Sequence, residues 1–300
     1  MSIINNANPG SVIRLICLID NVLTKRKGKP ISRKDLLDLC RPSNLPDTEG
    51  ARGRFESNLN FWIKEEFWIE DEQGVRSKDE LSSEEDFADR LRDTIVKNAL
   101  RKDQQNICDG NGIEPFLTSI TCLLAQNNYT FLGGDKLVSG SSGNVAQIVN
   151  KYLPERLKIN LSNDAPTLLE YGYFLGFLEP IDAKNFIVDP TRSIQNVLKN
   201  IFAQTNEMKI REFIKQLSTL LPMLDTGVFR QQIEPLMVEN GWVQTDSHLI
   251  SSSLSHSLTR LSNGFNIVLE VSSDDLEGMR IHSNNGSRVV NKVRYVGGTK

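Results

Sequence analysis

The sequence has little of the chemistry that builds metal and redox sites, with only four cysteines and three histidines in 300 residues. No two cysteines stand at the spacing of a zinc or redox motif, and the histidines are eight and 26 residues apart, which fits no common metal-binding pattern. We therefore expect no metal ion and no cofactor. Free thiols in mostly apolar helical patterns fit a reducing cytoplasm. The residues concerned are Cys17, Cys40, Cys108, Cys122, His248, His256 and His282.

Long apolar runs are missing as well. No stretch approaches the roughly 18 consecutive apolar residues that can span a bilayer. Pro9 and Gly10 interrupt the beginning of the chain, and no basic segment precedes an apolar one, so we expect no signal peptide. These absences predict a cytoplasmic protein with no membrane partner.

Catalytic motifs are also absent from the sequence. The loop Gly140-Ser141-Ser142-Gly143 is not followed by the Gly-Lys-Ser/Thr of a phosphate-binding loop, and no motif marks a serine or cysteine nucleophile. Glu270, Asp274 and Asp275 follow a predicted strand and have a faint likeness to nuclease carboxylates, but the lysine that such a site needs is missing. We predict that the chain is not an enzyme.

No large charge excess exists over the whole chain, whose formal net charge is -3, so any nucleic-acid contact has to come from local patches. Charge is segregated along the sequence. Residues 1–64 hold eleven Lys and Arg against six Asp and Glu, and residues 65–89 hold eleven acidic residues against two basic ones. From Arg280 to Lys300 there are five basic residues and no acidic one. The alternative is that these blocks are solvated surface without a partner.

The first 80 residues have the pattern of a winged helix-turn-helix. Apolar residues at helical spacing predict helices over residues 11–25 and 48–66. Between them, Ser32 and Asp35 form a capping pattern that begins a short helix, which Pro42 ends. An acidic hairpin then follows. This order of helix, basic turn, short helix, amphipathic helix and hairpin is that of a winged helix.

A short helix-to-strand junction recurs along the chain, at Lys64–Glu70, Phe174–Pro180 and Glu239–Gln244. In each case a helical segment gives way to an aromatic residue, an aliphatic residue and then Glu or Gln. The repeat predicts a mainly α (α+β) protein of tandem winged helix-turn-helix units with a small β-containing C-terminal part. The predicted divisions are a winged helix at 1–80, a linker and helix at 81–112, winged-helix-like units at 113–190 and 191–255, and a β-containing segment at 256–300.

The third predicted helix of the first unit carries the side chains that a major-groove reader uses. Arginine can hydrogen-bond to guanine edges and asparagine to adenine edges. The candidate base contacts are therefore Arg52, Arg54, Ser57 and Asn58. Candidate phosphate contacts are Arg14, Lys25, Arg26, Lys27, Lys29, Arg33 and Lys34. The alternative is an ordinary amphipathic helix with a charged solvent face. The acidic hairpin would repel phosphates and could equally be a docking face for a basic partner.

Secondary candidates for DNA contact lie further along the chain. Arg230 and Gln231 have base-reading chemistry in the third predicted unit, and Arg288, Lys292 and Arg294 belong to the basic C-terminal segment. The alternatives are that the later units are structural or partner-binding and that the basic segment is an exposed terminal hairpin.

The stretch Pro9–Leu15, the helix around Arg52 to Trp68 and the chain length together resemble the DpdG family. DpdG belongs to bacterial gene clusters that insert 7-deazaguanine derivatives into DNA and restrict unmodified DNA. The resemblance implies a bacterial, cytoplasmic protein that acts beside helicase-like and nuclease-like partners, and it carries over no functional residues. The expected function is a non-catalytic DNA-binding component of a multiprotein restriction or defence system, with double-stranded DNA and other protein subunits as partners. The alternatives are a protein–protein adaptor and a transcriptional regulator.

Overall fold

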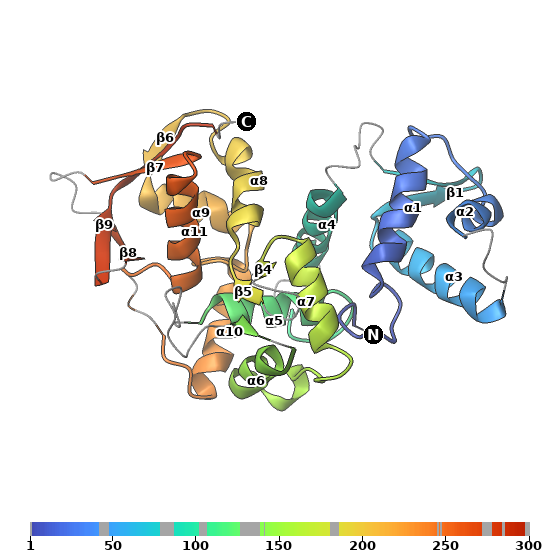
Figure 1. The fold of residues 1–300 in the computed structure, drawn as a ribbon, viewed down its shortest axis with the longest axis horizontal. Helices are drawn as coiled ribbons and strands as arrows, with labels where there is room; N and C mark the ends of the chain where they lie inside the picture. Colours follow the sequence, from blue (N-terminus) through green and yellow to red (C-terminus); the bar gives the residue numbers. More distant parts are fainter. Residues whose placement is uncertain are drawn as a thin grey trace.

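The computed structural model of the protein describes residues 2–41, 48–78, 87–101, 107–126, 139–140, 142–180, 186–244, 246, 248–271, 278–283 and 286–297. The fold is mixed α+β, with eleven α-helices and several small antiparallel sheets in these parts of the chain (Figure 1). No helix of these parts is long and apolar enough to cross a membrane.

The first group of elements is a three-helix cluster with a hairpin. It comprises α1 (Ile13–Lys25), α2 (Arg33–Cys40), α3 (Glu49–Lys64), β1 (Trp68–Asp71) and β2 (Gly74–Ser77). The Ser32 side chain accepts a hydrogen bond from the Asp35 amide, so the predicted cap of α2 is confirmed. Ile31, just before α2, pairs antiparallel with Val75, so β2 lies between Ile31 and β1. The apolar faces of the helices, including the fully buried Trp62, close around this ribbon.

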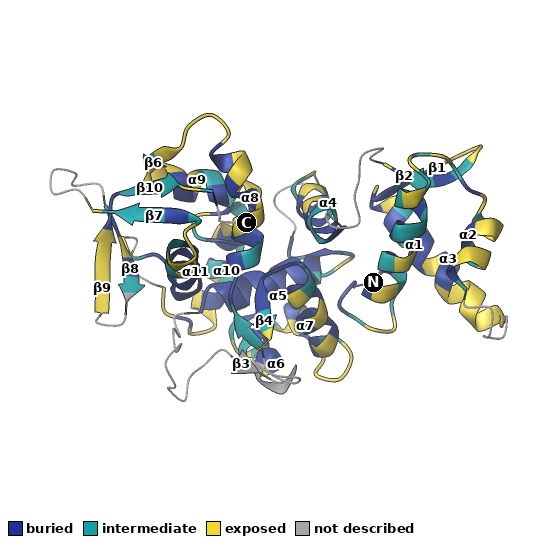
Figure 2. Ribbon diagram, turned by 45° about the horizontal axis from the view of Figure 1, so that its top comes forward, coloured by how far each residue is buried: buried dark blue, intermediate teal, exposed yellow. Residues whose placement is uncertain are grey.

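Helix α4 (Phe87–Arg101) lies between the first group and the remainder of the chain (Figures 1 and 2). The Arg90 guanidinium pairs with the buried Asp20 carboxylate of α1. Phe87, one turn earlier on the same helix, packs its ring against Phe67 of the first group and Phe174 of the second, with centroids 5.8 and 5.4 Å away. Ionic and aromatic contacts of α4 therefore join the first group to the second.

The second group repeats the arrangement of the first. It comprises α5 (Glu114–Leu124), β3 (Ser139–Gly140), α6 (Ser142–Tyr152), the 3-10 turn Glu155–Leu157, α7 (Ala165–Phe174), β4 (Leu178–Pro180) and β5 (Phe186–Val188). The strand that follows the first helix pairs with the last strand, so the sheet order is β3-β5-β4 and both pairs are antiparallel. Ile31, β2 and β1 stand in the same order in the first group.

The third group has the same sheet order, but it draws on distant parts of the sequence. Strand β6 pairs with β10 and β10 pairs with β7, both antiparallel, so the order is β6-β10-β7. Two insertions interrupt the pattern: α10, which packs against α5, and the hairpin β8–β9. The elements are α8 (Thr191–Ile201), β6 (Glu207–Lys209), α9 (Ile210–Leu220), α10 (Val228–Glu239), α11 (Ser252–Asn263), β7 (Ile267–Glu270), β8 (Met279–Ser283), β9 (Gly286–Val290) and β10 (Lys292–Tyr295).

This pairing differs from the expected division of the C-terminal part. The boundary placed between residues 255 and 256 falls inside α11. Residues 256–300 also do not stand apart from 191–255, because the β10 backbone hydrogen-bonds to β6. A pairing over some 85 residues of sequence is invisible to local patterns, which explains the difference.

The recurring junction is a shared helix C-terminus. In four helices a residue with positive φ follows the last turn, and the next amide donates to the carbonyl five residues earlier. The donor and acceptor pairs are Phe67–Trp62, Phe177–Gly172, Trp242–Met237 and Asn266–Leu261. Strands follow at once after α3, α7 and α11. The prediction that Trp242 begins a helix-to-strand junction is wrong: the described residues among 243–251 form no strand, and Leu249 makes only a single bridge to Arg280.

Candidate nucleic-acid interface

The exposed side of α3 is the strongest candidate for contact with DNA. Phe55, Leu59 and Trp62 bury the opposite side of the helix in the core of the first group. At about 100° per residue, the ridge most remote from that core carries four small or polar residues, Gly53, Ser57, Asn60 and Lys64. All four residues are exposed, and Figure 2 shows the N-terminal part of α3 as largely exposed.

The two arginines of α3 lie on opposite flanks of this ridge. Residues two positions apart on a helix do not face the same way, so Arg52 and Arg54 project on different sides. Both side chains are exposed. A groove of about 220 Å³ runs beside the Arg54 flank, between α3 and residues 6–9, and is lined by Gly53, Arg54 and Ser57 among others. The arrangement puts small polar side chains in the centre and cations at both edges.

Asn58 does not belong to this surface, and its prediction as a base contact is wrong. The residue is 2% exposed. Its Oδ1 accepts a hydrogen bond from the Gly10 amide at 2.9 Å, and its Nδ2 donates to the Arg54 carbonyl at 2.8 Å. The Asn58 amide therefore holds the N-terminal segment against α3. Asn60, which sequence reasoning missed, takes an exposed position instead, and its spacing of three from Ser57 is a signal that could have identified it.

Arg33 is engaged in an ion-pair network. Its guanidinium contacts Glu56 of α3 at 2.5 Å and Glu70 of β1 at 2.5 and 2.6 Å. The hydrogen bonds with Glu70 raise the pKa of Arg33 and lower the pKa of Glu70, so both groups favour their charged forms. Arg33 is thus occupied by protein carboxylates, contrary to the expectation of a phosphate contact.

The same network reduces the negative charge of the hairpin. Glu70 pairs with Arg33, and Asp71 pairs with Arg76 at 3.3 Å. Glu66, at the end of α3, contacts Arg101 at 2.7 Å. Three carboxylates of the acidic stretch, Glu66, Glu70 and Asp71, are therefore paired with arginines, while Glu72 is exposed.

The basic turn after α1 is exposed but lies apart from the α3 ridge. Gly10, near the start of α1, contacts Asn58 of α3, whereas the turn follows the other end of a 13-residue helix, roughly 20 Å away. Arg26 is half-buried and donates to the Lys29 and Pro30 carbonyls. The exposed cations of this region are Lys25, Lys27, Lys29 and Lys34, whereas the exposed Arg14 lies in the first turn of α1, at the opposite end of that helix.

Arg230, one of the secondary candidates, is placed inside the fold, so its prediction as a DNA contact is wrong. It is 3% exposed and contacts Asp225 and Glu234, each at 2.6 Å. The exposed Gln231 donates its amide to the Thr226 carbonyl.

The basic C-terminal residues are mostly paired across their sheet. Lys292 contacts Glu207 at 2.8 Å and Arg294 contacts Glu270 at 2.9 Å. Arg288 is exposed on β9. The structure therefore does not gather these three residues into one basic surface.

Helices α7 and α11, which occupy the place of α3 in their groups, present much less surface. Residues 252–258 of α11 are all buried, and α7 exposes only Pro166, Glu170 and Tyr173. Of the three helices, α3 alone offers a continuous polar and basic side to solvent.

Catalytic and metal chemistry find little support in the described parts of the chain. There, no three His, Cys, Asp and Glu side chains are grouped to hold a metal ion. Burial raises the pKa of Cys17 and Cys40 to about 11, so these thiols stay protonated near neutral pH. Glu270 pairs with Arg294, while Asp274 and Asp275 lie outside the described residues.

Comparison with known proteins places the chain in a family. The DpdG-like family matches residues 1–275. Comparison with curated proteins and with solved structures gave no significant match. The family match covers most of the chain and agrees with the resemblance noted at Pro9–Leu15 and along α3 to β1; the chain therefore belongs to the DpdG-like family, which suggests a component of the Dpd 7-deazaguanine DNA-modification system.

Proposed function

We propose that the chain is a non-catalytic DNA-binding component of the Dpd system and that α3 contacts duplex DNA. The single observation that carries the proposal is the side of α3 that faces solvent. It has a centre of small polar residues, an arginine on each flank and a lysine at its end. A helix of this kind fits a major groove, where the central side chains approach base edges and the flanking cations reach phosphates.

We further propose that all three groups are winged helices. The support is their common order of helix, short strand, helix, helix and two strands, in which the first strand pairs with the last. The proposed units cover residues 2–78, 107–188 and 191–295, and α3, α7 and α11 take the position of the recognition helix. Because α7 and α11 are mostly buried, their units serve as scaffold, and contact with DNA falls to the first unit.

The charge-reversed double variant Arg52→Glu/Arg54→Glu tests the DNA contact. Duplex binding of the parent should weaken steeply with salt, and the variant should lose most of its affinity at low salt. The slope of log affinity against log salt should fall by about one unit for each phosphate that the variant no longer neutralises. The matched control is Lys97→Glu/Lys215→Glu, which makes the same change in net charge at exposed positions of α4 and α9.

If the α3 variant binds duplex DNA as tightly as the control, the DNA-binding proposal is wrong. The adaptor hypothesis would then explain the winged helices better, with the acidic hairpin as the surface to test.

A further inference from the structure

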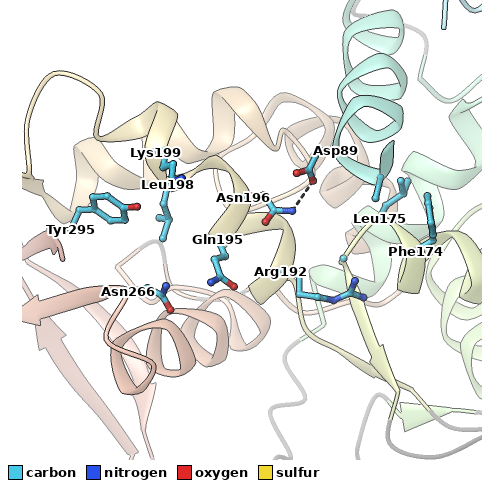
Figure 3. Close-up of a pocket in the computed structure, with 12 residues that line it drawn as sticks. Asp89, Phe174, Leu175, Arg192, Gln195, Asn196, Leu198, Lys199, Asn266 and Tyr295 are labelled. Atoms are coloured by element: carbon cyan, nitrogen blue, oxygen red, sulfur yellow. Dashed lines mark hydrogen bonds between the residues drawn. The ribbon is translucent and has the colours of Figure 1, made fainter. Parts of the chain in front are cut away.

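A second polar groove lies where the third group meets α4, away from the first group (Figures 1 and 3). Its volume is about 500 Å³, which is in the range of small-ligand sites. It is lined by the start of α4, by α8, by the α7–β4 junction, by β10 and by the junction between α11 and β7. The groove therefore forms where several segments distant in sequence meet.

Four side chains with unused polar groups converge on this groove. They are Gln195 and Lys199 on one side of α8, Asn266 after α11, and Tyr295 at the end of β10 (Figure 3). Within the described structure, the side-chain polar groups of these four residues make no hydrogen bond or ion pair. Two carboxamides, a phenol and an ammonium group are thus available to a ligand.

The charge of the groove favours an anion. Arg192 is held by Glu179, and Asp89 is held by Arg92 at 2.8 Å and by the Asn196 amide at 2.6 Å. Lys199 is the one lining ion without an opposite charge among the described residues. A lysine without a paired carboxylate can bind a phosphate. The carboxamides beside it can hydrogen-bond to a polar group joined to that phosphate.

Aromatic rings also border the groove. One face of the Tyr295 ring stacks on Phe202, with ring centroids 5.3 Å apart, and Tyr295 also borders the groove. Phe174 lines the groove as well.

We propose that this groove binds a nucleotide with an unpaired base. Lys199 contacts the phosphate, the Gln195 and Asn266 amides bond to the base edge, and the Tyr295 ring stacks on the base. The nucleotide can come from single-stranded DNA or from the free pool, and both share this chemistry. The site is separate from α3, so its test does not depend on whether α3 binds duplex DNA.

Direct binding measurements test the site in the full-length Arg52→Glu/Arg54→Glu background, which removes the α3 contribution. The probes are a labelled single-stranded 12-mer and unlabelled deoxynucleoside monophosphates. Lys199→Glu and the pair Gln195→Ala/Asn266→Ala should each weaken binding roughly tenfold, whereas the exposed control Lys215→Glu should not. Competition by the monophosphates would identify a free nucleotide as the ligand, and failure to compete would identify the strand.

The proposal is overturned if neither probe binds, or if the Lys199 and Asn266 variants bind as the control does. In that case, a protein partner becomes the occupant to look for.

Discussion

The guanidinium of Arg90 forms a two-pronged pair with the carboxylate of Asp20, at 2.5 and 3.3 Å, and thereby fastens α4 to α1. The Asp20 side chain is only 3% exposed and also accepts a hydrogen bond from Trp68 Nε1. The Arg90 guanidinium lies over the Phe67 and Phe87 rings at 5.6 and 6.0 Å. An ion pair, aromatic rings and burial are therefore combined at the junction between the first group and the rest of the molecule.

Replacing Arg90 by alanine should destabilise the protein by about 3 kcal/mol, because it leaves a carboxylate buried without its cation. The measurement is urea unfolding followed by tryptophan fluorescence. The double variant Asp20→Asn/Arg90→Met removes both charges and keeps an acceptor for Trp68, so it should lose less stability than Arg90→Ala alone. A larger loss in the double variant would contradict this account.

Asp189 links the second and third groups and makes stability depend on pH. Burial raises its pKa, but the neighbouring His256, a hydrogen bond from Thr191 and the charge of Arg260 outweigh burial and hold the pKa well below its usual range. The stabilisation is therefore present above the ordinary carboxyl value of 3.8 and is lost as the pH falls through the folded-state value. Asp189→Asn should lower the melting temperature at neutral pH, and its difference from the parent should shrink below about pH 4.

A surface carboxylate provides the control for this experiment. Asp246 also has a lowered pKa, first because of the His248 backbone hydrogen bond, but it is exposed to solvent. Asp246→Asn should change the melting temperature little at any pH, because exposed pairs contribute little. Equal effects of the two substitutions on the melting temperature would show that burial is not the reason why Asp189 stabilises the protein.

Local sequence signals predicted much of the fold. Helix caps such as Ser32 and apolar spacing act over three or four residues, so the three helices of the first group were found close to their observed bounds. Sheet pairing was missed where the partners are remote, as between β6 and β10. The Gly241–Trp242 cap was mistaken for a helix-to-strand junction because the same bonds close α10 as close α3 and α7. A cap specifies how a helix ends and carries no information about whether a strand follows.

The candidate site was predicted in part for similar reasons. The basic and polar residues of α3 are exposed as expected, except Asn58. Position 58 stands three after Phe55 and four before Trp62, which is core spacing, so its polarity was a misleading signal. The pairing of Arg33 and Arg230 with carboxylates depends on the tertiary fold and could not be found from charge counts along the chain.

Gly176 tests how far the shared helix end depends on glycine. Its φ is 83°, and an added Cβ would lie 3.0 Å from the Ser193 amide nitrogen, so Gly176→Ala should cost about 2 kcal/mol. Gly241 has nearly the same φ, 85°, but open space around it. Gly241→Ala should therefore cost only the backbone penalty, about 1 kcal/mol, in the same denaturation assay. If both variants lose the same free energy of unfolding, the close approach to Ser193 does not add to the cost of the substitution.

The last prediction is that the chain alone is not an enzyme. It follows from the missing motifs, from protonated thiols and from the pairing of Glu270 with Arg294. Purified protein should leave plasmid DNA intact with magnesium or manganese and should not hydrolyse ATP. Hard cations favour clustered carboxylates, so the strongest hidden site would combine Glu270 with Asp274 and Asp275, which lie outside the described residues. Cleavage that disappears in Asp274→Ala/Asp275→Ala, with Asp246→Ala as the unaffected control, would make the C-terminal strands a catalytic region and reverse the prediction.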